Sequence, residues 1–459
     1  MRTDTIAAIA TGMSASGIGI VRISGDEAFH VINRIFRDKR GNTLALDMKA
    51  SHTVHYGFIY DGEEKIDEVL VLIMKGPHSY TAEDTVEIDC HGGILMVKKI
   101  LETVIRYGAR TADPGEFTKR AFLNGRIDLA QAEAVSDVIC ATNEYALKSS
   151  VSQLGGSVSK KIRELRSGIL YHIAYIESAL DDPEHISLEG YGNQLLEALI
   201  PMVRDVEQLI RSADDGRIMR EGVKTVILGK PNAGKSSLMN VLLGEERAIV
   251  TEIAGTTRDT LEEHIYLQGI SLNVVDTAGI RDTEDLVEKI GVDRAMKAAR
   301  DADLLIYVVD GSRPLDNNDM EIIEFIRDRK AIVLLNKSDL QVVVEKEELE
   351  SLAGQKVISI SAKEEKGIGD LEQEIKRLFY HGELTFNDQI YITNVRHKEA
   401  LEQALLSLKM VEKSIGDGMP EDFYSIDLMN SYEQLGLILG EEVDDDLVNE
   451  IFSKFCMGK

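Results

Sequence analysis

The chain has 459 residues, 29% of them charged and 44% hydrophobic, which is typical of a globular protein with room for about three domains. Its 52 basic and 79 acidic side chains give a formal net charge of −27 at pH 7. An acidic field disfavours non-specific binding to phosphate, so any nucleic-acid contact must be local or supplied by a partner.

The cysteines and the apolar runs indicate the compartment. Cys90, Cys140 and Cys456 form no C-x-x-C pair, which excludes a disulfide framework and a structural zinc site. The chain has no run of about 18 apolar residues, and its start resembles neither a secretory signal nor a transit peptide. We therefore expect a cytoplasmic protein with no membrane span.

Residues 1–120 predict a strand-rich α+β domain. Short runs at 19–23, 53–60 and 68–74 are rich in β-formers and are bounded by Gly, Asp or Pro, as strands are. One helix is expected after Gly92-Gly93, where apolar residues recur with helical spacing.

The rest of the chain predicts two helical stretches around an α/β segment. In 121–218 and again in 381–459, apolar residues recur at i, i+3 and i+4, as in long helices. Residues 222–380 alternate apolar runs with amphipathic segments, which indicates a parallel sheet with crossover helices. The simplest interpretation is a discontinuous α-helical domain into which an α/β domain is inserted.

A phosphate-binding pattern opens the α/β segment. Residues 229–236 spell G-x-x-x-x-G-K-S between an apolar run and a helical pattern. The glycines let the backbone curl, so that its N–H groups converge on phosphate oxygens at a helix N-terminus. Lys235 would reach the β- and γ-phosphates, and Ser236 would bind Mg²⁺.

Three more motifs follow apolar runs in chain order. D-x-x-G at 276–279 is placed to organise Mg²⁺ and to meet the γ-phosphate, and S-A-K at 361–363 would pack beneath the base. N-K-S-D at 336–339 ends in Asp339, whose carboxylate can accept hydrogen bonds from guanine N1–H and its 2-amino group. The carboxyl ends of parallel strands share one edge of a sheet, so these elements together predict a GTP-binding domain.

The residues that complete hydrolysis are less clear from the motifs. Many related switches carry Gln after D-x-x-G to orient water, but here the position is Ile280, which has no polar side-chain atom. Residues 251–259 form a candidate switch loop, with Thr257 suited to Mg²⁺. Asn232 offers a carbonyl oxygen for a monovalent cation, and backbone carbonyls near Thr251 and Ile253 could complete its cage. A slow GTPase without such a cation is an equally good interpretation.

The motif sequences resemble one family closely. The resemblance rests on G-K-P-N-A-G-K-S-S-L-M-N, T-E-I-A-G-T-T-R-D, D-T-A-G-I-R and E-K-I-G-V-D-R-A, and also on flanking segments at 17–25, 87–93, 114–118, 122–129 and 455–459. These are similar to the MnmE (TrmE) family of tRNA-modification GTPases, within the TrmE-Era-Era-like-YihA-YphC (TRAFAC) class of GTPases. The likeness spans the whole chain, and the flanking segments carry its specificity.

The resemblance implies a three-part protein with a defined role. Residues 1–120 would be an α+β domain for tetrahydrofolate binding and dimerisation, 121–218 and 381–459 the helical domain, and 222–380 the G domain. The homodimer would bring its G domains together in K⁺ and GTP, which stimulates hydrolysis. With the FAD-dependent partner MnmG (GidA), in a heterotetramer, it would add a carboxymethylaminomethyl or aminomethyl group to C5 of the wobble uridine of certain tRNAs. The one-carbon donor would be 5-formyl- or 5,10-methylene-tetrahydrofolate, and FAD would lie on the partner.

The resemblance also assigns residues to sites. Glu288 takes the position of the catalytic glutamate, which would orient the attacking water through a second water. Ser236 and Thr257 would hold Mg²⁺, and the K⁺ ligands would be Asn232, Thr251, Ile253 and Thr256. The GTP contacts expected in full are Asn232, Ala233, Gly234, Lys235, Ser236, Ser237, Thr251, Glu252, Ile253, Ala254, Gly255, Thr256, Thr257, Asp276, Thr277, Ala278, Gly279, Asn336, Lys337, Asp339, Ser361, Ala362 and Lys363. Arg22, Glu87, Arg126 and Lys459 align with folate contacts, although the family commonly has Lys at the position of Arg126. Cys456 is a candidate functional thiol.

Two local patterns have plain structural explanations. Cys90-His91 could suggest a metal pair, but without a second pair core packing is the better interpretation. The basic residues Lys160, Lys161, Arg163 and Arg166 could contact tRNA phosphate, but the solvated face of a helix explains them better.

Two other functions remain open at this point. A ribosome-assembly GTPase that binds rRNA would need a basic module, yet residues 381–459 carry 6 basic and 16 acidic side chains, a net charge of −10. A folate-dependent aminomethyl-transfer enzyme with GTPase control and no RNA role is the third interpretation. Mass spectrometry of tRNA nucleosides from a deletion strain would separate all three.

Overall fold

The computed structural model describes residues 4–244, 262–267, 270–275, 299–380, 390–441, 443, 445–455 and 458. The chain forms two compact units, one from residues 1–140, 150–205 and 399–459 and the other from 141–149 and 206–398. Helices α5 (Glu144–Leu154), α7 (Tyr191–Glu221) and α13 (Val395–Gly416) each belong partly to one unit and partly to the other. The domain boundaries expected from the sequence stay predictions.

The first unit begins with a seven-stranded sheet in the order β3-β4-β5-β6-β2-β1-β7. Its strands are β1 (Ile6–Ile9), β2 (Ile18–Ser24), β3 (Phe36–Asp38), β4 (Thr53–Asp61), β5 (Glu64–Met74), β6 (Thr85–His91) and β7 (Arg110–Thr111). All neighbours pair antiparallel except β1 and β7, which are parallel. The three strands expected from the sequence are confirmed.

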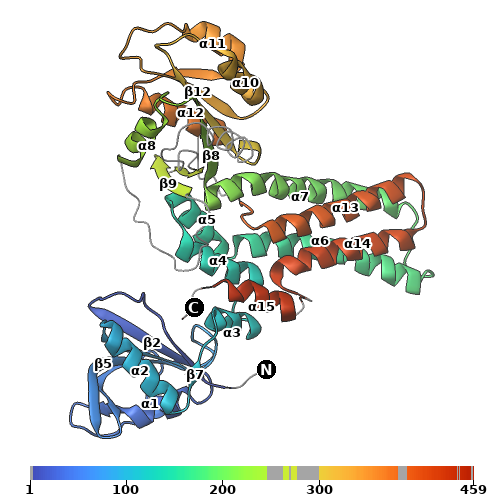
Figure 1. Cartoon of the computed structure of the whole chain (residues 1–459). Helices are drawn as coiled ribbons and strands as arrows, with labels where there is room; N and C mark the ends of the chain where they lie inside the picture. The colour runs from blue at the N-terminus through green and yellow to red at the C-terminus, as the bar shows by residue number, and fades with distance from the viewer. Residues whose placement is uncertain are drawn as a thin grey trace. The chain divides into compact units, whose positions relative to one another are not determined.

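Helices α1 (Ala28–Ile35) and α2 (Ile94–Arg106) lie on one face of this sheet (Figure 1). Buried Val21, Ile23 and Ile88 point into the core with them. Successive side chains of a strand point to opposite faces, so Arg22 and Glu87 lie on the face away from these helices. The helix expected after Gly92-Gly93 is α2, whereas α1 was not predicted, because eight residues give a short periodic signal.

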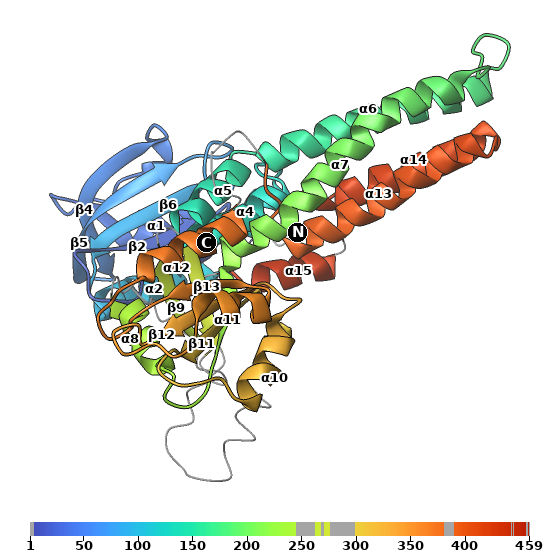
Figure 2. The ribbon, with the colours of Figure 1, turned by 90° about the horizontal axis from the view of Figure 1, so that it is seen from above.

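The first unit continues as a helical bundle built from two distant parts of the sequence. Its short helices are α3 (Glu116–Leu123), α4 (Leu129–Cys140) and α15 (Asp445–Ser453). The long helices α6 (Ser157–Asp181) and α14 (Glu421–Leu439) lie side by side (Figures 1 and 2). Arg166 on α6 links them by donating from Nε to the carbonyl oxygen of Tyr432 at 3.2 Å. The discontinuous helical arrangement is therefore confirmed.

The second unit contains a six-stranded sheet in the order β13-β12-β11-β8-β10-β9. The strands are β8 (Val223–Leu228), β9 (Glu262–Leu267), β10 (Ile270–Val275), β11 (Leu304–Asp310), β12 (Ala331–Asn336) and β13 (Lys356–Ser359). Among the described strands, only β9 is antiparallel to its neighbour. The described ranges of this unit's α/β part also contain the helices α8 (Lys235–Gly244), α10 (Asn317–Ile326), α11 (Lys346–Ala353) and α12 (Ile368–Tyr380).

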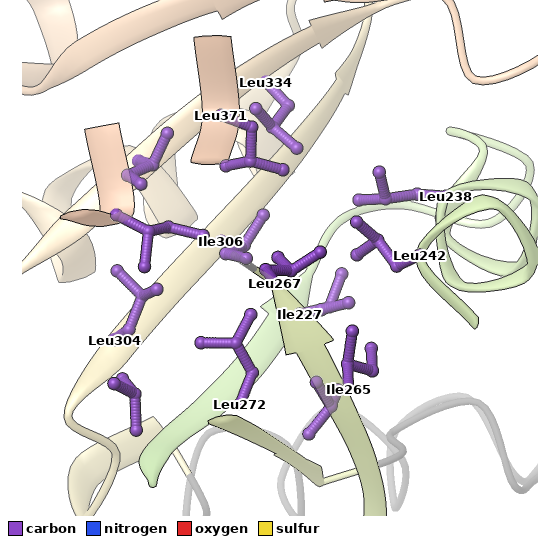
Figure 3. Close-up of a cluster of buried hydrophobic side chains, with 14 of the residues drawn as sticks. Ile227, Leu238, Leu242, Ile265, Leu267, Leu272, Leu304, Ile306, Leu334 and Leu371 are labelled. Atoms are coloured by element: carbon purple, nitrogen blue, oxygen red, sulfur yellow. The ribbon is translucent and has the colours of Figure 1, made fainter. Parts of the chain in front are cut away.

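Apolar cores cover both faces of this sheet, which explains why its strands are continuous apolar runs. One core includes Leu238 of α8, Leu304 of β11 and Leu371 of α12, which Figure 3 labels among the buried side chains of this cluster. The other core includes Tyr307 and Ile323. The parallel sheet with crossover helices is thus confirmed, and its carboxyl edge carries the motif loops.

Candidate functional sites

The phosphate loop connects β8 to α8, and two of its positions accept only glycine. Gly229 has φ +149°, and a Cβ there would lie 2.5 Å from the carbonyl oxygen of Val308. Gly234 has φ +104°, and a Cβ there would lie 2.1 Å from Nδ2 of Asn336. The loop therefore packs directly against two neighbouring strand ends, and its backbone leads into the N-terminus of α8.

Lys235 is held over this loop by the loop's own carbonyl groups. Its Nζ donates to the carbonyl oxygen of Gly229 at 2.6 Å and to that of Lys230 at 2.9 Å. Burial lowers the pKa of its ammonium group. An ammonium has three N–H donors, so one remains for a phosphate oxygen.

The base-recognition loops are tied to the phosphate loop by one amide side chain. Asn336, at the end of β12, donates from Nδ2 to the carbonyl oxygen of Ala233 at 2.8 Å, and its Oδ1 accepts the backbone N–H of Ala362 at 3.1 Å. Ser361 donates to Asp339 Oδ1 at 2.7 Å, and this hydrogen bond lowers the pKa of that carboxyl group. The structure thus brings the motifs at 229–236, 336–339 and 361–363 together and keeps Asp339 ionised.

Asp310 belongs to this cluster but was not predicted from the sequence. Burial opposes its ionisation, but hydrogen bonds from Lys337 and Ser312 prevail and lower the pKa of the carboxyl group. Lys337 Nζ lies 2.6 Å from Asp310 Oδ2, and Lys337 has φ +66°. The available signal was position, because Asp310 ends the apolar strand β11 just as the motif residues follow theirs.

Several expected contacts lie outside the described residues. They comprise the switch-loop positions Thr251, Glu252, Ile253, Ala254, Gly255, Thr256 and Thr257, the D-x-x-G positions Asp276, Thr277, Ala278 and Gly279, and Ile280 and Glu288. Ser236 and Ser237 are in the first turn of α8, and Asn232 is an exposed loop residue with φ +62°. One predicted ligand each for Mg²⁺ and K⁺ is therefore described, and their ligand sets stay predictions.

A second cluster lies in the first unit, on the sheet face away from α1 and α2. Arg22 and Glu87 are directly opposite on β2 and β6, with Nε 2.7 Å from Oε1. The guanidinium carbons of Arg22 and Arg126 lie 5.2 Å and 4.7 Å from the ring centre of Tyr80. The structure brings together three of the four residues predicted to bind folate, and Tyr80 between them was not predicted.

The chain end reaches the same cluster. Arg22 donates from Nη1 to the carbonyl oxygen of Gly458 at 3.4 Å, across 436 positions of sequence. Gly458 has φ +86°, and a Cβ there would lie 2.2 Å from the carbonyl oxygen of Ile9. Only glycine allows the backbone at this position to pass so close to β1. Cys456 and Lys459 lie outside the described residues.

Asp89 is an additional buried polar group near this cluster. It follows Glu87 by two positions on β6, and its Oδ1 is buried without a hydrogen-bond partner among the described atoms. Burial, and then the charge of Glu87, raise the pKa of its carboxyl group. The sequence signal for Asp89 is the alternation of acidic residues along the strand.

Core packing was expected for Cys90-His91 and a solvated helix face for the basic residues at 160–166, and the structure bears differently on the two expectations. Cys90 is buried in the sheet core, as expected, while the His91 ring hydrogen-bonds Asp67 at 2.7 Å. Among the described residues, no group of three or more His, Cys, Asp or Glu could hold a metal ion. The expectation of a solvated face is wrong for Arg166, which is 7% exposed and pairs with Glu441 at 2.6 Å. No helix in the described ranges is long and apolar enough to cross a membrane.

The comparisons with known proteins cover the whole chain. The family description "MnmE helical domain" matches residues 129–456, and "GTP-binding protein TrmE N-terminus" matches residues 5–126. The tRNA modification GTPase MnmE of Lachnoclostridium phytofermentans is 61% identical over 459 residues, 100% of each chain. The chain belongs to the MnmE family of tRNA-modification GTPases. The MnmE proteins of Alkaliphilus metalliredigens and Clostridioides difficile are each 49% identical, with 99% of each chain covered.

Membership of the MnmE family makes the nucleotide cluster that of a GTPase and confirms the α+β, helical and P-loop parts of the fold. The G domain of the T. maritima FeoB iron transporter is 28% identical over 34% of this chain and 98% of its own, with a TM-score of 0.27, a likeness too low to add to the assignment.

Proposed function

We propose that this MnmE family member hydrolyses GTP to support modification of C5 of the wobble uridine of certain tRNAs, acting with the FAD-dependent partner MnmG. The group added is carboxymethylaminomethyl or aminomethyl. Family membership supports the tRNA role, and the joined phosphate and base loops support the GTPase role. The observation that carries the proposal is Asn336, which links both loops at one strand edge.

Hydrolysis is proposed to need Mg²⁺ and K⁺. Ser236 and Thr257 would hold Mg²⁺, and Asn232, Thr251, Ile253 and Thr256 would hold K⁺. Asn232 fits this role because its exposed position in the phosphate loop leaves the amide oxygen accessible. K⁺ would supply positive charge where negative charge develops in the transition state. Glu288 would orient the attacking water, since Ile280 has no polar side-chain atom.

The cluster at Arg22 is proposed to bind a tetrahydrofolate derivative, in its 5-formyl or 5,10-methylene form. The residues fit this ligand chemically. Arg22, Arg126 and Lys459 offer cations for the glutamate-tail carboxylates, and Glu87 offers acceptors for pterin N–H groups. One of the four lone-pair sites of Glu87 is used by Arg22, so others remain for a ligand.

The chain is proposed to act as a cytoplasmic homodimer that joins MnmG in a heterotetramer. The sheet face away from α1 and α2 supports dimerisation because it exposes large apolar side chains, which are Val54, Tyr56 and Leu70 on the adjacent strands β4 and β5, and Ile18 on β2. Exposed apolar patches of this kind mark interaction surfaces. Replacing Leu70 by Glu should shift the mass measured by light scattering toward a monomer, whereas an unchanged dimer would place the interface elsewhere.

The modification itself is tested by mass spectrometry of tRNA nucleosides from a strain that lacks the gene. Loss of the C5-modified wobble uridine, restored by the parent gene but not by Asp339→Asn, would support a GTPase-dependent role in tRNA modification. Normal tRNA nucleosides together with a defect in ribosomal subunits would favour the ribosome-assembly alternative. Normal tRNA and normal ribosomes would favour the folate enzyme without an RNA role.

A further inference from the structure

Lys230, the second residue of the phosphate loop, has a function that the motif does not assign. Its side chain leaves the loop and reaches the start of α10. Its Nζ lies 2.7 Å from Asp316 Oδ2 and 2.5 Å from Asp319 Oδ2. The ammonium therefore joins the loop to two carboxylates of another element.

The two carboxylates are themselves fixed by the cap of α10. Asp316 accepts the backbone N–H groups of Asn318 at 2.9 Å and Asp319 at 3.3 Å, while Asp319 accepts the N–H of Asp316 at 2.9 Å. This reciprocal capping box satisfies N–H groups that have no partner within the helix. Lys230 consequently binds a rigid pair rather than two mobile side chains.

Asp319 extends the contact into the core. It is 2% exposed, and its Oδ1 accepts a hydrogen bond from the Tyr307 hydroxyl at 2.7 Å. Tyr307 is fully buried on the central strand β11. Burial lowers the pKa of Lys230, but its bonds to Asp316 and Asp319 prevail and raise it. The ion pair is therefore anchored to the sheet and Lys230 stays charged.

The backbone of Lys230 connects this anchor to Lys235. Its carbonyl oxygen accepts a hydrogen bond from Nζ of Lys235, the lysine that the motif assigns to the β- and γ-phosphates. A displacement of Lys230 therefore moves an acceptor that orients Lys235. On the other side of the loop, Asn336 holds Ala233 independently.

We infer that Lys230 is a positioning residue for GTP binding and hydrolysis, which holds the phosphate loop on the Asp319–Tyr307 pair and thereby orients Lys235. Neither the family's K⁺ ligands nor its catalytic glutamate enters this inference. It depends only on the GTPase activity and not on folate or tRNA.

The test measures GTP dissociation constants, kcat and KM for variants of the full chain. Lys230→Met should raise the dissociation constant for GTP about tenfold, because charge-assisted hydrogen bonds are lost. Lys230→Arg should restore most of the affinity, since its guanidinium can donate to both carboxylates. Lys356→Met is the matched control, because Lys356 lies on the edge strand β13 and pairs only loosely with Glu350 at 3.8 Å.

Two measurements distinguish a positioning role of Lys230 from simple unfolding of the variant. Lys230→Met leaves Asp319 buried without its cation, so Tyr307→Phe is included as a milder variant that removes only one hydrogen bond and should weaken GTP binding less. The preference for GTP over inosine triphosphate should stay unchanged, since Asp339 is held by Ser361. Parent-like affinity and turnover in Lys230→Met would overturn the inference. A reduced folded fraction with parent-like affinity in that fraction would also overturn it.

Discussion

At the level of single residues, Asp339 gives the most direct test of base recognition. Ser361 orients its carboxylate and keeps it ionised at neutral pH. Asp339→Asn replaces one acceptor by a donor, so the affinity for GTP should fall roughly tenfold or more while that for xanthosine triphosphate rises. Competition binding with the two nucleotides measures this. An unchanged preference for guanine would remove Asp339 from the base site.

His172 makes the stability of the first unit depend on pH. It is 9% exposed, its Nδ1 lies 2.7 Å from the Tyr191 hydroxyl, and burial lowers the pKa of its ring below the ordinary value of 6.5. Below pH 6.5 the unfolded chain binds a proton that the folded chain resists. The free energy of unfolding should therefore fall as the pH drops from 6.5 toward the lowered pKa.

The measurement is urea unfolding of the parent and of His172→Gln at pH 7.5 and pH 5.5. Other groups titrate in both proteins, so the informative quantity is the difference between them. The parent should lose more stability than the variant on acidification. Equal losses in the two proteins would show that His172 does not contribute.

At the level of elements, the contact between α6 and α14 depends on Gly436. A Cβ at this position would lie 3.1 Å from Nη2 of Arg166. The guanidinium cannot easily retreat, because the Tyr432 carbonyl, Glu441 and the Tyr432 ring hold it. Gly436→Ala should therefore destabilise the protein by about 1 kcal/mol. This is the net effect, after the gain of similar size that alanine brings as a better helix former.

Gly416, the last residue of α13, is the control for this substitution. A Cβ there meets nothing within 4 Å, so Gly416→Ala should be neutral or slightly stabilising. Thermal unfolding of both variants measures the difference. Equal stability of Gly436→Ala and the parent would show that Arg166 can adjust at little cost.

At the level of the whole molecule, hydrolysis should depend on the cation. We expect turnover to be slow in Na⁺ and fast in K⁺, because Ile280 cannot orient water. Asn232→Ala should abolish this difference and leave GTP binding largely intact, whereas Glu288→Ala should lower kcat with little change in affinity. The same turnover of the parent in both salts would contradict the K⁺ proposal.

A deletion at the C-terminus should affect the folate cluster and leave the nucleotide site active. Deleting residues 456–459 should weaken folate binding and abolish tRNA modification, because Arg22 loses its contact with Gly458. GTP hydrolysis in K⁺ should persist, since the nucleotide motifs lie between residues 229 and 363. Full modification in the truncated protein would show the end to be dispensable. Loss of GTPase activity as well would indicate a role in folding.

Local patterns in the sequence were sufficient for the fold classes and for the nucleotide motifs. Local chemistry within a few residues determines the glycines at 229 and 234, the lysine at the start of α8, and the carboxylates or amides at the ends of apolar strands. Motif spacing therefore predicted the nucleotide cluster before any contact was known. The same patterns could not show that Lys337 binds Asp310 or that Lys230 binds Asp319, because the two partners in each pair lie on different elements of the fold.

Only the tertiary structure decided which distant residues meet. Alternation along β2 and β6 determines the face of Arg22 and Glu87, but the antiparallel register makes them a pair. The approach of Gly458 to β1, and the burial of Arg166 between α6 and α14, depend on how far-separated segments pack. Sequence by itself determined the local chemistry of each segment, since backbone conformation and side-chain type act over short range. Contacts between residues hundreds of positions apart were decided by the fold, since they exist only once the chain has folded.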